Sequence, residues 1–216
     1  MHGCMLAWVS IATAAVSRPP SFGRRSTWES AYVEQAEFSW YCGWADLEPF
    51  WAELCPTKSH RVLLPGVGND NSMVDMFDAG WSNLAAFDYA EAGVARAREL
   101  FGARPVDVRL ADARDLPYAT ASFDAALEKG ALDSIQLGQP DRLKGLRQAV
   151  DELTRVVRPG GVLLSVTAVA TDRIAAAVHA TGAWTVLRDG STHITDEGFA
   201  TTNVDATLLA WERRSV

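Results

Sequence analysis

The chain has 216 residues, of which 48% are hydrophobic and 22% are charged. This length fits one globular domain, and the composition is that of a folded protein rather than a disordered or fibrous one. Twenty Lys and Arg residues against 27 Asp and Glu residues give a net charge of −7, which disfavours a general nucleic-acid-binding role because phosphate backbones are repelled. The three cysteines, Cys4, Cys42 and Cys55, form no Cys-x-x-Cys pattern. They predict neither a disulfide scaffold nor a zinc site, and they favour free thiols in a reducing, cytoplasmic compartment.

The first 28 residues differ in charge from the rest of the chain. They contain three of the 20 basic residues and no acidic residue, so residues 29–216, with 17 basic and 27 acidic residues, carry a net charge of −10. The uncharged stretch 1–17 is shorter than the roughly 20 apolar residues that span a bilayer, and no membrane association is predicted. We therefore expect residues 1–26 to be a flexible or targeting segment and residues 27–216 to be the folded domain. As a transit peptide, residues 1–26 would place the protein in a mitochondrion or plastid instead of the cytoplasm.

From residue 60 onward, short apolar runs alternate with amphipathic stretches, the pattern of a parallel sheet covered by helices. Apolar runs predict strands at residues 61–64, 84–87, 106–110, 123–127 and 162–169. Helices are predicted over residues 70–78, 91–101 and 172–180. A longer helix, with Asp141 as its cap, carries apolar residues at helical spacing from Leu143 to Val157 and is expected to end at the Arg-Pro-Gly-Gly sequence 158–161.

Residues 184–187 and 204–211 predict two more strands, separated by an Asp189-Gly190 turn and a polar loop. Because no helix is predicted between them, they should pair as an antiparallel hairpin. The predicted fold class is α/β, with a doubly wound, mostly parallel seven-stranded sheet that ends in a C-terminal antiparallel hairpin.

Candidate ligand-binding residues follow the first three predicted strands, since ligands of open parallel sheets bind beyond the carboxyl ends of the strands. Gly66 and Gly68 let the backbone approach a ligand closely. A dinucleotide fingerprint would need a third glycine at Asn71, which disfavours a dehydrogenase. Asp88 ends the second strand 20 residues after Gly68, where a carboxylate can accept hydrogen bonds from both hydroxyls of a ribose.

The third strand adds Asp112, which can accept a hydrogen bond from an adenine amino group, and Ala113, which can supply a backbone amide. Each feature alone is explained as well by a tight turn, a helix cap or a loop acid. Together, on successive strand ends, they predict a ligand that contains a nucleoside.

With this turn and these carboxylates, the sequence resembles the class I S-adenosylmethionine-dependent methyltransferases, whose cofactor positions match Gly66, Gly68, Asp88 and Asp112. A narrower resemblance is to the eukaryotic methyltransferase-like family that methylates elongation factor 1-alpha at lysines or the N-terminus. Four segments carry it: VLLPGVGND (62–70), FDYA (87–90), FDAALEKGALDSI (123–135) and LTRVVRPGGVL (153–163). The resemblance implies S-adenosylmethionine as the cofactor, with Tyr89, Ala113 and Lys129 among its contacts. By residue type alone, Lys129 could equally pair with Glu128 or Asp133.

The same family has an N-terminal aromatic segment that closes over the cofactor, and its aromatic positions match Trp28, Tyr32 and Trp40. Core packing is the alternative use of these rings, although aromatic faces also attract a sulfonium or an amine. Two departures stand in the first turn, where the family usually has Cys at Val67 and Ser at Asp70.

The resemblance implies a methyltransferase that acts on an amine, first of all a lysine exposed on a protein with a basic surface such as elongation factor 1-alpha. No residue is assigned as a catalytic base, no metal site is predicted, and no signal bears on the oligomeric state. A small-molecule (thiol or amine) methyltransferase would share every cofactor residue and stays open. So does a non-catalytic partner subunit that binds S-adenosylmethionine.

Overall fold

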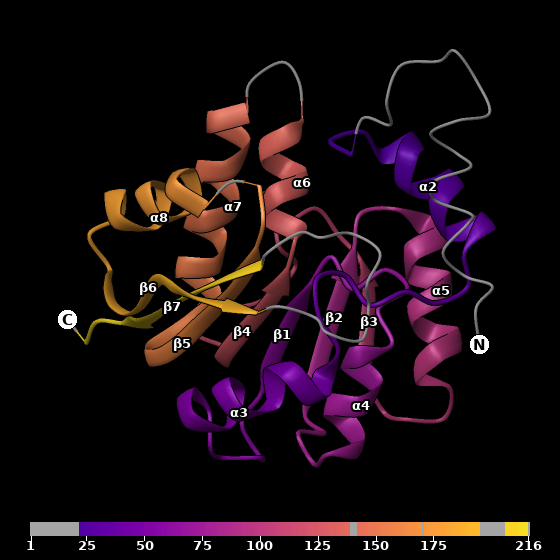
Figure 1. The fold of residues 1–216 in the computed structure, drawn as a ribbon, viewed down its shortest axis with the longest axis horizontal. Helices are drawn as coiled ribbons and strands as arrows, with labels where there is room; N and C mark the ends of the chain where they lie inside the picture. Colours follow the sequence, from indigo (N-terminus) through magenta and orange to yellow (C-terminus); the bar gives the residue numbers. More distant parts are fainter. Residues whose placement is uncertain (1–21, 139–141, 170, 195–205, 216) are drawn as a thin grey trace.

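The structure is a computed structural model that describes residues 22–138, 142–169, 171–194 and 206–215. Its seven strands form one sheet, in the order β3-β2-β1-β4-β5-β7-β6 (Figure 1). Strands β1 to β5 are parallel, whereas β7 runs antiparallel to both of its neighbours, β5 and β6. The predicted fold class, with its C-terminal antiparallel hairpin, is confirmed. The elements are α2 (Arg25–Glu34), α3 (Trp44–Leu54), β1 (Val62–Pro65), α4 (Ser72–Asp78), β2 (Leu84–Asp88), α5 (Glu91–Phe101), β3 (Asp107–Leu110), β4 (Phe123–Lys129), α6 (Ala131–Leu137), α7 (Arg142–Val156), β5 (Val157–Thr167), α8 (Thr171–Ala180), β6 (Trp184–Ile194) and β7 (Ala206–Arg213).

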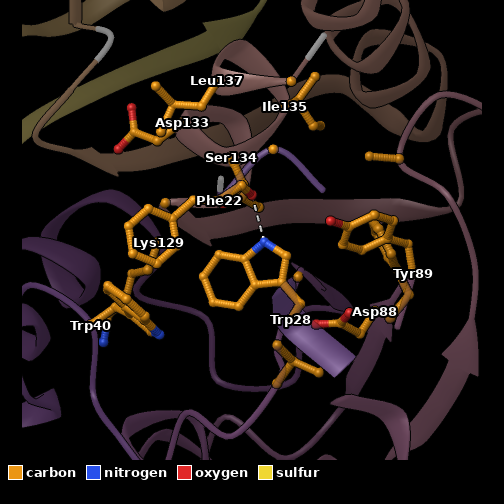
Figure 2. Close-up of a pocket in the computed structure, with 18 of the residues that line it drawn as sticks. Phe22, Trp28, Trp40, Asp88, Tyr89, Lys129, Asp133, Ser134, Ile135 and Leu137 are labelled. Carbon is orange, nitrogen blue, oxygen red and sulfur yellow. Dashed lines mark hydrogen bonds between the residues drawn. The ribbon is translucent and has the colours of Figure 1, made fainter. Parts of the chain in front are cut away.

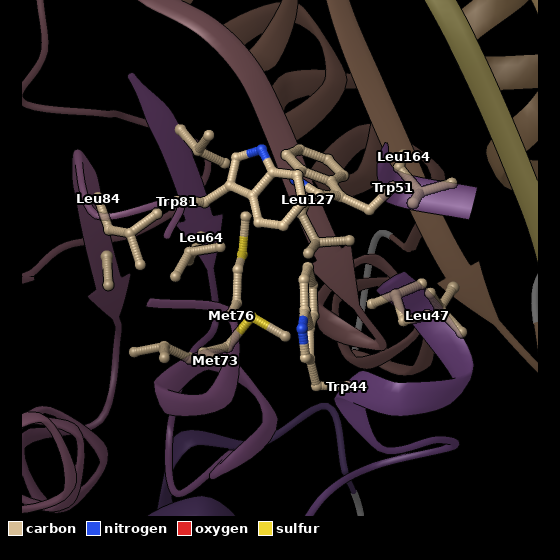
Figure 3. Packing of buried hydrophobic residues seen from close by; sticks show 14 of the residues in the cluster. Trp44, Leu47, Trp51, Leu64, Met73, Met76, Trp81, Leu84, Leu127 and Leu164 are labelled. Atoms are coloured by element: carbon tan, nitrogen blue, oxygen red, sulfur yellow. The ribbon is translucent and has the colours of Figure 1, made fainter. Parts of the chain in front are cut away.

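Helices cover both faces of the sheet, so the central strands are buried on both sides. Successive residues of β1 alternate between two cores: Val62 and Leu64 belong to one, and Leu63 to the other. The first core lies under α3, α4 and α5 and is packed around Trp51 and Met76 (Figure 3). The second lies under α7 and α8. This two-sided burial explains why the strands appear in the sequence as continuous apolar runs rather than as alternating patterns.

Three described helices, α2, α3 and α6, are absent from the sequence-based prediction. Helix α3 buries Trp44, Leu47 and Trp51 although it contains Pro49, a residue that argues against a helix interior because it removes a backbone donor. Helix α2 buries Trp28 and Tyr32. In α2 the apolar residues follow the helical period only weakly, so the sequence gives little local signal of that helix.

The predicted Asp189-Gly190 turn is wrong. Both residues lie inside β6, whose pairing with β7 shifts register between Asp189 and Thr192. Gly190 has a φ of +91°, so the Asp-Gly pair accommodates a bulge in a continuous strand rather than a chain reversal. The polar loop and Val204, the predicted start of the last strand, lie outside the described residues.

The long helix α7 also differs from the prediction at its ends. Leu143 has 51% of its surface exposed, and Val157 belongs to β5, which includes the Arg-Pro-Gly-Gly sequence expected as a helix stop. The Arg-Pro-Gly-Gly sequence is accommodated within β5 by a shift in the register of its pairing with β4, between Phe123 and Ala125. The predicted cap, Asp141, lies outside the described residues.

Candidate functional site

A cavity of about 350 Å³ opens where the carboxyl ends of β1, β2 and β4 meet α2 and α6 (Figure 2). The sheet order reverses here, because β1 lies between β2 and β4, and such switch points are where open α/β sheets bind ligands. Of the ten residues predicted to bind the cofactor, all but Gly68 line the cavity. These nine are Trp28, Tyr32, Trp40, Gly66, Asp88, Tyr89, Asp112, Ala113 and Lys129.

The turn after β1 depends on two glycines in the left-handed region, with φ values of +62° at Gly66 and +45° at Gly68. A Cβ atom at Gly66 would lie 2.8 Å from the Cβ of Ala131, and one at Gly68 would lie 2.3 Å from the hydroxyl oxygen of Tyr32. Both positions therefore exclude side chains for two reasons, backbone conformation and space. The Tyr32 hydroxyl covers Gly68, which explains why this residue does not line the cavity.

Asp88, at the end of β2, is 2% exposed. Its carboxylate accepts a hydrogen bond from the amide of Ala90 at 2.8 Å and another from the Tyr32 hydroxyl at 3.3 Å. Burial raises the pKa of this carboxyl to about 6, although the hydrogen bonds act in the opposite direction. Asp88 is thus a buried acceptor at the floor of the cavity, as a ribose-binding residue would need to be.

Asp112, after β3, is held by Arg114. The Arg114 guanidinium and backbone amide both donate to the Asp112 carboxylate, with the amide at 2.9 Å, and this arginine lowers the pKa of Asp112. Ala113 is buried beside it, and Tyr89 also lines the cavity. Arg114 thus fixes the orientation of the Asp112 carboxylate. The adenine-binding role of Asp112 stays a prediction.

Lys129, at the end of β4, pairs with neither Glu128 nor Asp133. Its ammonium lies 3.0 Å from a carboxylate oxygen of Asp70 and donates to the Ser72 hydroxyl and the Cys42 carbonyl, each at 2.7 Å. These three contacts use all three ammonium donors. Lys129 therefore joins β4 to the β1–α4 connection and to the segment before α3. Its charge is balanced by Asp70, at the position where the resembled family usually has Ser.

Aromatic rings from the N-terminal segment form one wall of the cavity. The Trp28 ring stacks on Tyr32 at 5.5 Å and meets Trp40 edge-on at the same distance. The Trp28 indole donates a hydrogen bond to the backbone carbonyl of Phe22 at 2.6 Å (Figure 2). A Cβ atom at Gly23 would lie only 2.2 Å from Gly138, so the chain before α2 lies directly against the end of α6. Phe22 and Gly23 precede the predicted domain boundary at residue 27, and both line the cavity.

Helices α2 and α5 cap each other. The Glu29 carboxylate of α2 accepts hydrogen bonds from the Glu91 and Ala92 amides at the start of α5, each at 2.9 Å. In return, Arg96 of α5 donates to the Tyr32 carbonyl near the end of α2 at 2.8 Å. Each charge complements the helix end that it contacts. The two helices lie side by side (Figure 1), and this pairing places Tyr32 over Asp88.

Among the polar cavity residues that sequence reasoning did not assign to the site are Tyr41 and Asp133. The Tyr41 hydroxyl donates to Asp133 at 2.7 Å, and Asp133 also accepts from the Thr167 hydroxyl at 2.6 Å and the Ala168 amide at 3.2 Å. Asp133 lies in the segment that carries the narrower family resemblance, which was the one available signal. The contact with Tyr41 spans 92 positions and has no local signature.

Within the described residues, no group of three or more His, Cys, Asp and Glu side chains is arranged to hold a metal ion. No helix in the same part of the chain is long and apolar enough to cross a membrane.

Comparisons with known proteins agree with this arrangement. A family model described as a methyltransferase domain matches residues 63–165. The mouse protein EEF1A lysine methyltransferase 4 is 31% identical over an alignment that covers 65% of this chain and 59% of the mouse protein, so the chain spans about three fifths of that relative's length.

Two solved structures show the same fold at low identity. The N-methyltransferase NodS from Bradyrhizobium japonicum, in complex with S-adenosyl-L-homocysteine, has a TM-score of 0.59 at 15% identity, covering 79% of this chain and 86% of that one. The [4+2]-cyclase SpnF has a TM-score of 0.62 at 15% identity, covering 94% and 100%. Because a methyltransferase and a cyclase share this fold, the fold alone does not decide the chemistry. Residues 63–165 match the model of a methyltransferase domain, the chain shares its fold with methyltransferases of known structure, and its sequence resembles the eEF1A lysine methyltransferases.

Proposed function

We propose that this chain is an S-adenosylmethionine-dependent methyltransferase that methylates an amine of a protein, a lysine side chain first of all. The observation that carries the proposal is one cavity that combines a glycine turn, carboxylates on successive strand ends and an aromatic wall. We choose lysine as the methyl acceptor because the mouse relative is named EEF1A lysine methyltransferase 4.

The residues present fit the proposed cofactor. Gly66 lines the cavity with backbone alone, which lets a ligand approach closely, and the buried Asp88 carboxylate offers acceptor oxygens suited to ribose hydroxyls. The cavity volume of about 350 Å³ lies within the range of small-molecule sites. In this proposal, Gly66, Asp88, Tyr89, Asp112 and Ala113 hold the cofactor. Lys129 contacts it from the end of β4 while its ammonium stays bonded to the protein. Gly68 shapes the turn, and Trp28, Tyr32 and Trp40 close over the cofactor. When bound, the cofactor supplies an electrophilic methyl group on a sulfonium.

The chain's own part in the reaction is to bind the amine without its proton and to align it. A lysine has a reference pKa near 10.4, and apolar surroundings lower the pKa of an amine because they disfavour its charged form. The aromatic wall around Trp28 and Trp40 supplies such surroundings. Holding the amine in line with the methyl group lowers the barrier to transfer, because the two reacting groups no longer have to meet and orient in solution.

We propose that the domain acts in the cytoplasm and that it begins before the predicted boundary at residue 27, because α2 starts at Arg25 and both Phe22 and Gly23 line the cavity. Cys42 and Cys55 are buried free thiols, which fits a reducing compartment. The charge of −10 on residues 29–216 favours an acceptor protein with a basic surface, and complementary charge makes the transfer rate fall as salt rises.

The test is incubation of the purified chain and labelled S-adenosylmethionine with elongation factor 1-alpha, with whole-cell extract and with a panel of small thiols and amines. Label on a lysine of the elongation factor or of an extract protein supports the proposal. Label confined to a small thiol or amine would establish a small-molecule methyltransferase instead. Cofactor binding without transfer to any acceptor would leave the non-catalytic partner subunit.

A further inference from the structure

The backbone at Tyr41 adopts a conformation that is rare for a residue with a side chain. Its φ is +66°, and the Cys42 amide donates a hydrogen bond to the Trp40 carbonyl at 2.8 Å. Together these describe a γ-turn of the rare type with positive φ at its centre. Such strain persists only where the surroundings determine it, and it gathers at functional sites.

The surroundings of Tyr41 determine where its ring and hydroxyl lie. The ring lies over Gly130, where a Cβ atom would be 3.0 Å from a ring carbon and 3.2 Å from the hydroxyl oxygen. Gly130 itself has a φ of +79°. The hydroxyl donates its one proton to Asp133 at 2.7 Å, and Asp133 is fixed from the other side by Thr167.

The charges in the cavity single out the Tyr41 and Asp133 pair. Of the four aspartates that line the cavity, Asp70 forms an ion pair with Lys129 and Asp112 forms one with Arg114. In the described part of the chain, Asp88 and Asp133 form no ion pair. In Figure 2, Asp133 lies on one side of the Trp28 indole and Asp88 on the other. If Asp88 binds the ribose, Asp133 is the aspartate without an ion pair that is available to a second ligand on the other side of the Trp28 indole.

The hydroxyl of Tyr41 has a defined hydrogen-bonding polarity. Because its proton is directed at Asp133, its oxygen can only accept a hydrogen bond from a third group. An amine nitrogen carries such a donor even after it has lost its extra proton, whereas a thiolate carries none. The nearby Asp133 carboxylate adds negative potential, which favours an incoming cation and disfavours an anion.

We infer that the Tyr41 hydroxyl accepts a hydrogen bond from the methyl acceptor and, oriented by Asp133, makes the site selective for amines over thiols. Tyr41 is the group that touches the substrate, and Asp133 is a positioning residue. The inference rests on the proposed function and deepens it, because it assigns the acceptor end of the same cavity. It also makes Tyr41 and Asp133 the residues that distinguish an amine methyltransferase from a thiol methyltransferase.

The experiment compares labelled methyl transfer to n-butylamine, a lysine side-chain analogue, and to 1-butanethiol. In Tyr41→Phe the ring stays and the hydroxyl is lost. The amine nitrogen gains positive charge as it takes the methyl group, so kcat/KM for the amine should fall about 10- to 150-fold, the equivalent of one hydrogen bond to a charged group. Transfer to the thiol and affinity for S-adenosylhomocysteine should each change less than about threefold. Asp133→Asn should lower the amine-to-thiol ratio in the same direction.

Tyr118→Phe is the matched control. The Tyr118 hydroxyl is buried and has no hydrogen-bond partner in the described structure, and this residue lies outside the cavity, so its loss should leave both transfer rates and cofactor affinity unchanged. Urea unfolding and circular dichroism of each variant verify the fold.

Several results would overturn the inference while leaving the proposed function intact. One is amine transfer by Tyr41→Phe at the wild-type rate; another is equal loss of amine and thiol transfer, which indicates a purely structural role. Transfer by the wild type to the thiol, with no label on n-butylamine or on any protein, overturns both. If the wild type transfers to neither small probe, the assay with elongation factor and extract decides the proposed function. Ligand-observed NMR of n-butylammonium on the protein loaded with S-adenosylhomocysteine then decides the inference: binding that Tyr41→Phe weakens supports it, and equal binding refutes it.

Discussion

The hydroxyl of Tyr32 donates a hydrogen bond to the Asp88 carboxylate at 3.3 Å, across 56 positions of the chain. This contact joins the N-terminal helix α2 to the residue predicted to bind the ribose. Since both side chains line the same cavity, the carboxylate that holds α2 is also the one proposed to bind the cofactor.

Cofactor affinity should depend on pH through this carboxylate. The pKa of Asp88 is raised to about 6, so affinity for S-adenosylhomocysteine is expected to fall as pH drops below 6, when the carboxylate that accepts the ribose hydroxyls is protonated. Tyr32→Phe removes a hydrogen bond that favours the charged form, so the midpoint should move to higher pH. Calorimetric titration between pH 5 and 8 measures both. Asp88→Asn should bind about 10- to 150-fold more weakly at pH 7 and lose this pH dependence; a variant that retained the same midpoint would show that another group titrates.

The close approach of α2 and α5 predicts opposite effects for two glycine substitutions. In an open helix, Gly→Ala is stabilising by roughly 1 kcal/mol. At Gly93, however, the added Cβ would lie 2.7 Å from Asp88 and 2.8 Å from the Tyr32 ring, so Gly93→Ala should displace α2 and weaken cofactor binding. Gly145→Ala in α7 meets nothing closer than 3.5 Å and should raise the free energy of unfolding. Urea unfolding and calorimetry on both variants test this contrast, which equal behaviour of the two would contradict.

Glu29 should stabilise the domain by capping α5 from another helix. The residue at the α5 N-cap, Ala90, forms no side-chain cap, and Glu29 accepts the hydrogen bonds of the Glu91 and Ala92 amides instead. Loss of such a cap typically costs about 0.5–2 kcal/mol, and this is the expected decrease in unfolding free energy for Glu29→Ala. Hydrogen exchange should accelerate at the α5 amides and along α2. Glu34→Ala, at the exposed end of α2, serves as the control and should change neither measurement appreciably.

The buried Glu128 should make the protein less stable as pH rises. Its side chain is fully buried and accepts a hydrogen bond from the Ser165 hydroxyl, and burial raises its pKa to about 8. Between the ordinary value near 4.5 and pH 8, the folded protein holds a proton that the unfolded chain has released, so stability falls across that window. Between pH 6.5 and 9, where Asp88 is already mostly ionised, the loss should be about 2 kcal/mol.

Replacement by glutamine tests this assignment. Glu128→Gln keeps the shape and removes the titration, so its unfolding free energy, measured in urea, should stay nearly constant from pH 6.5 to 9. Glu212→Gln, at an exposed position of β7, should retain the wild-type slope. An unchanged slope in Glu128→Gln would assign the pH dependence elsewhere.

Local sequence was sufficient for the parallel strands at the centre of the sheet and for the residues that follow them. The apolar runs of β1, β2 and β4 could be recognised without a partner, because strands buried on both faces need apolar side chains at every position. The strand ends then placed Gly66, Asp88 and Asp112 at one edge, since the carboxyl ends of parallel strands share that edge. That inference needed only the order of elements along the chain.

The tertiary structure decided everything that depends on contacts between distant segments. The pairing of Lys129 with Asp70, the contact of Tyr41 with Asp133 and the capping of α5 by Glu29 each join residues from different elements. The Asp189-Gly190 sequence suited a turn, and pairing along β7 made it a bulge instead. Such partners are selected by the packing of α2, α6 and the sheet around one cavity, and a side chain has no local preference that encodes which distant group it will meet.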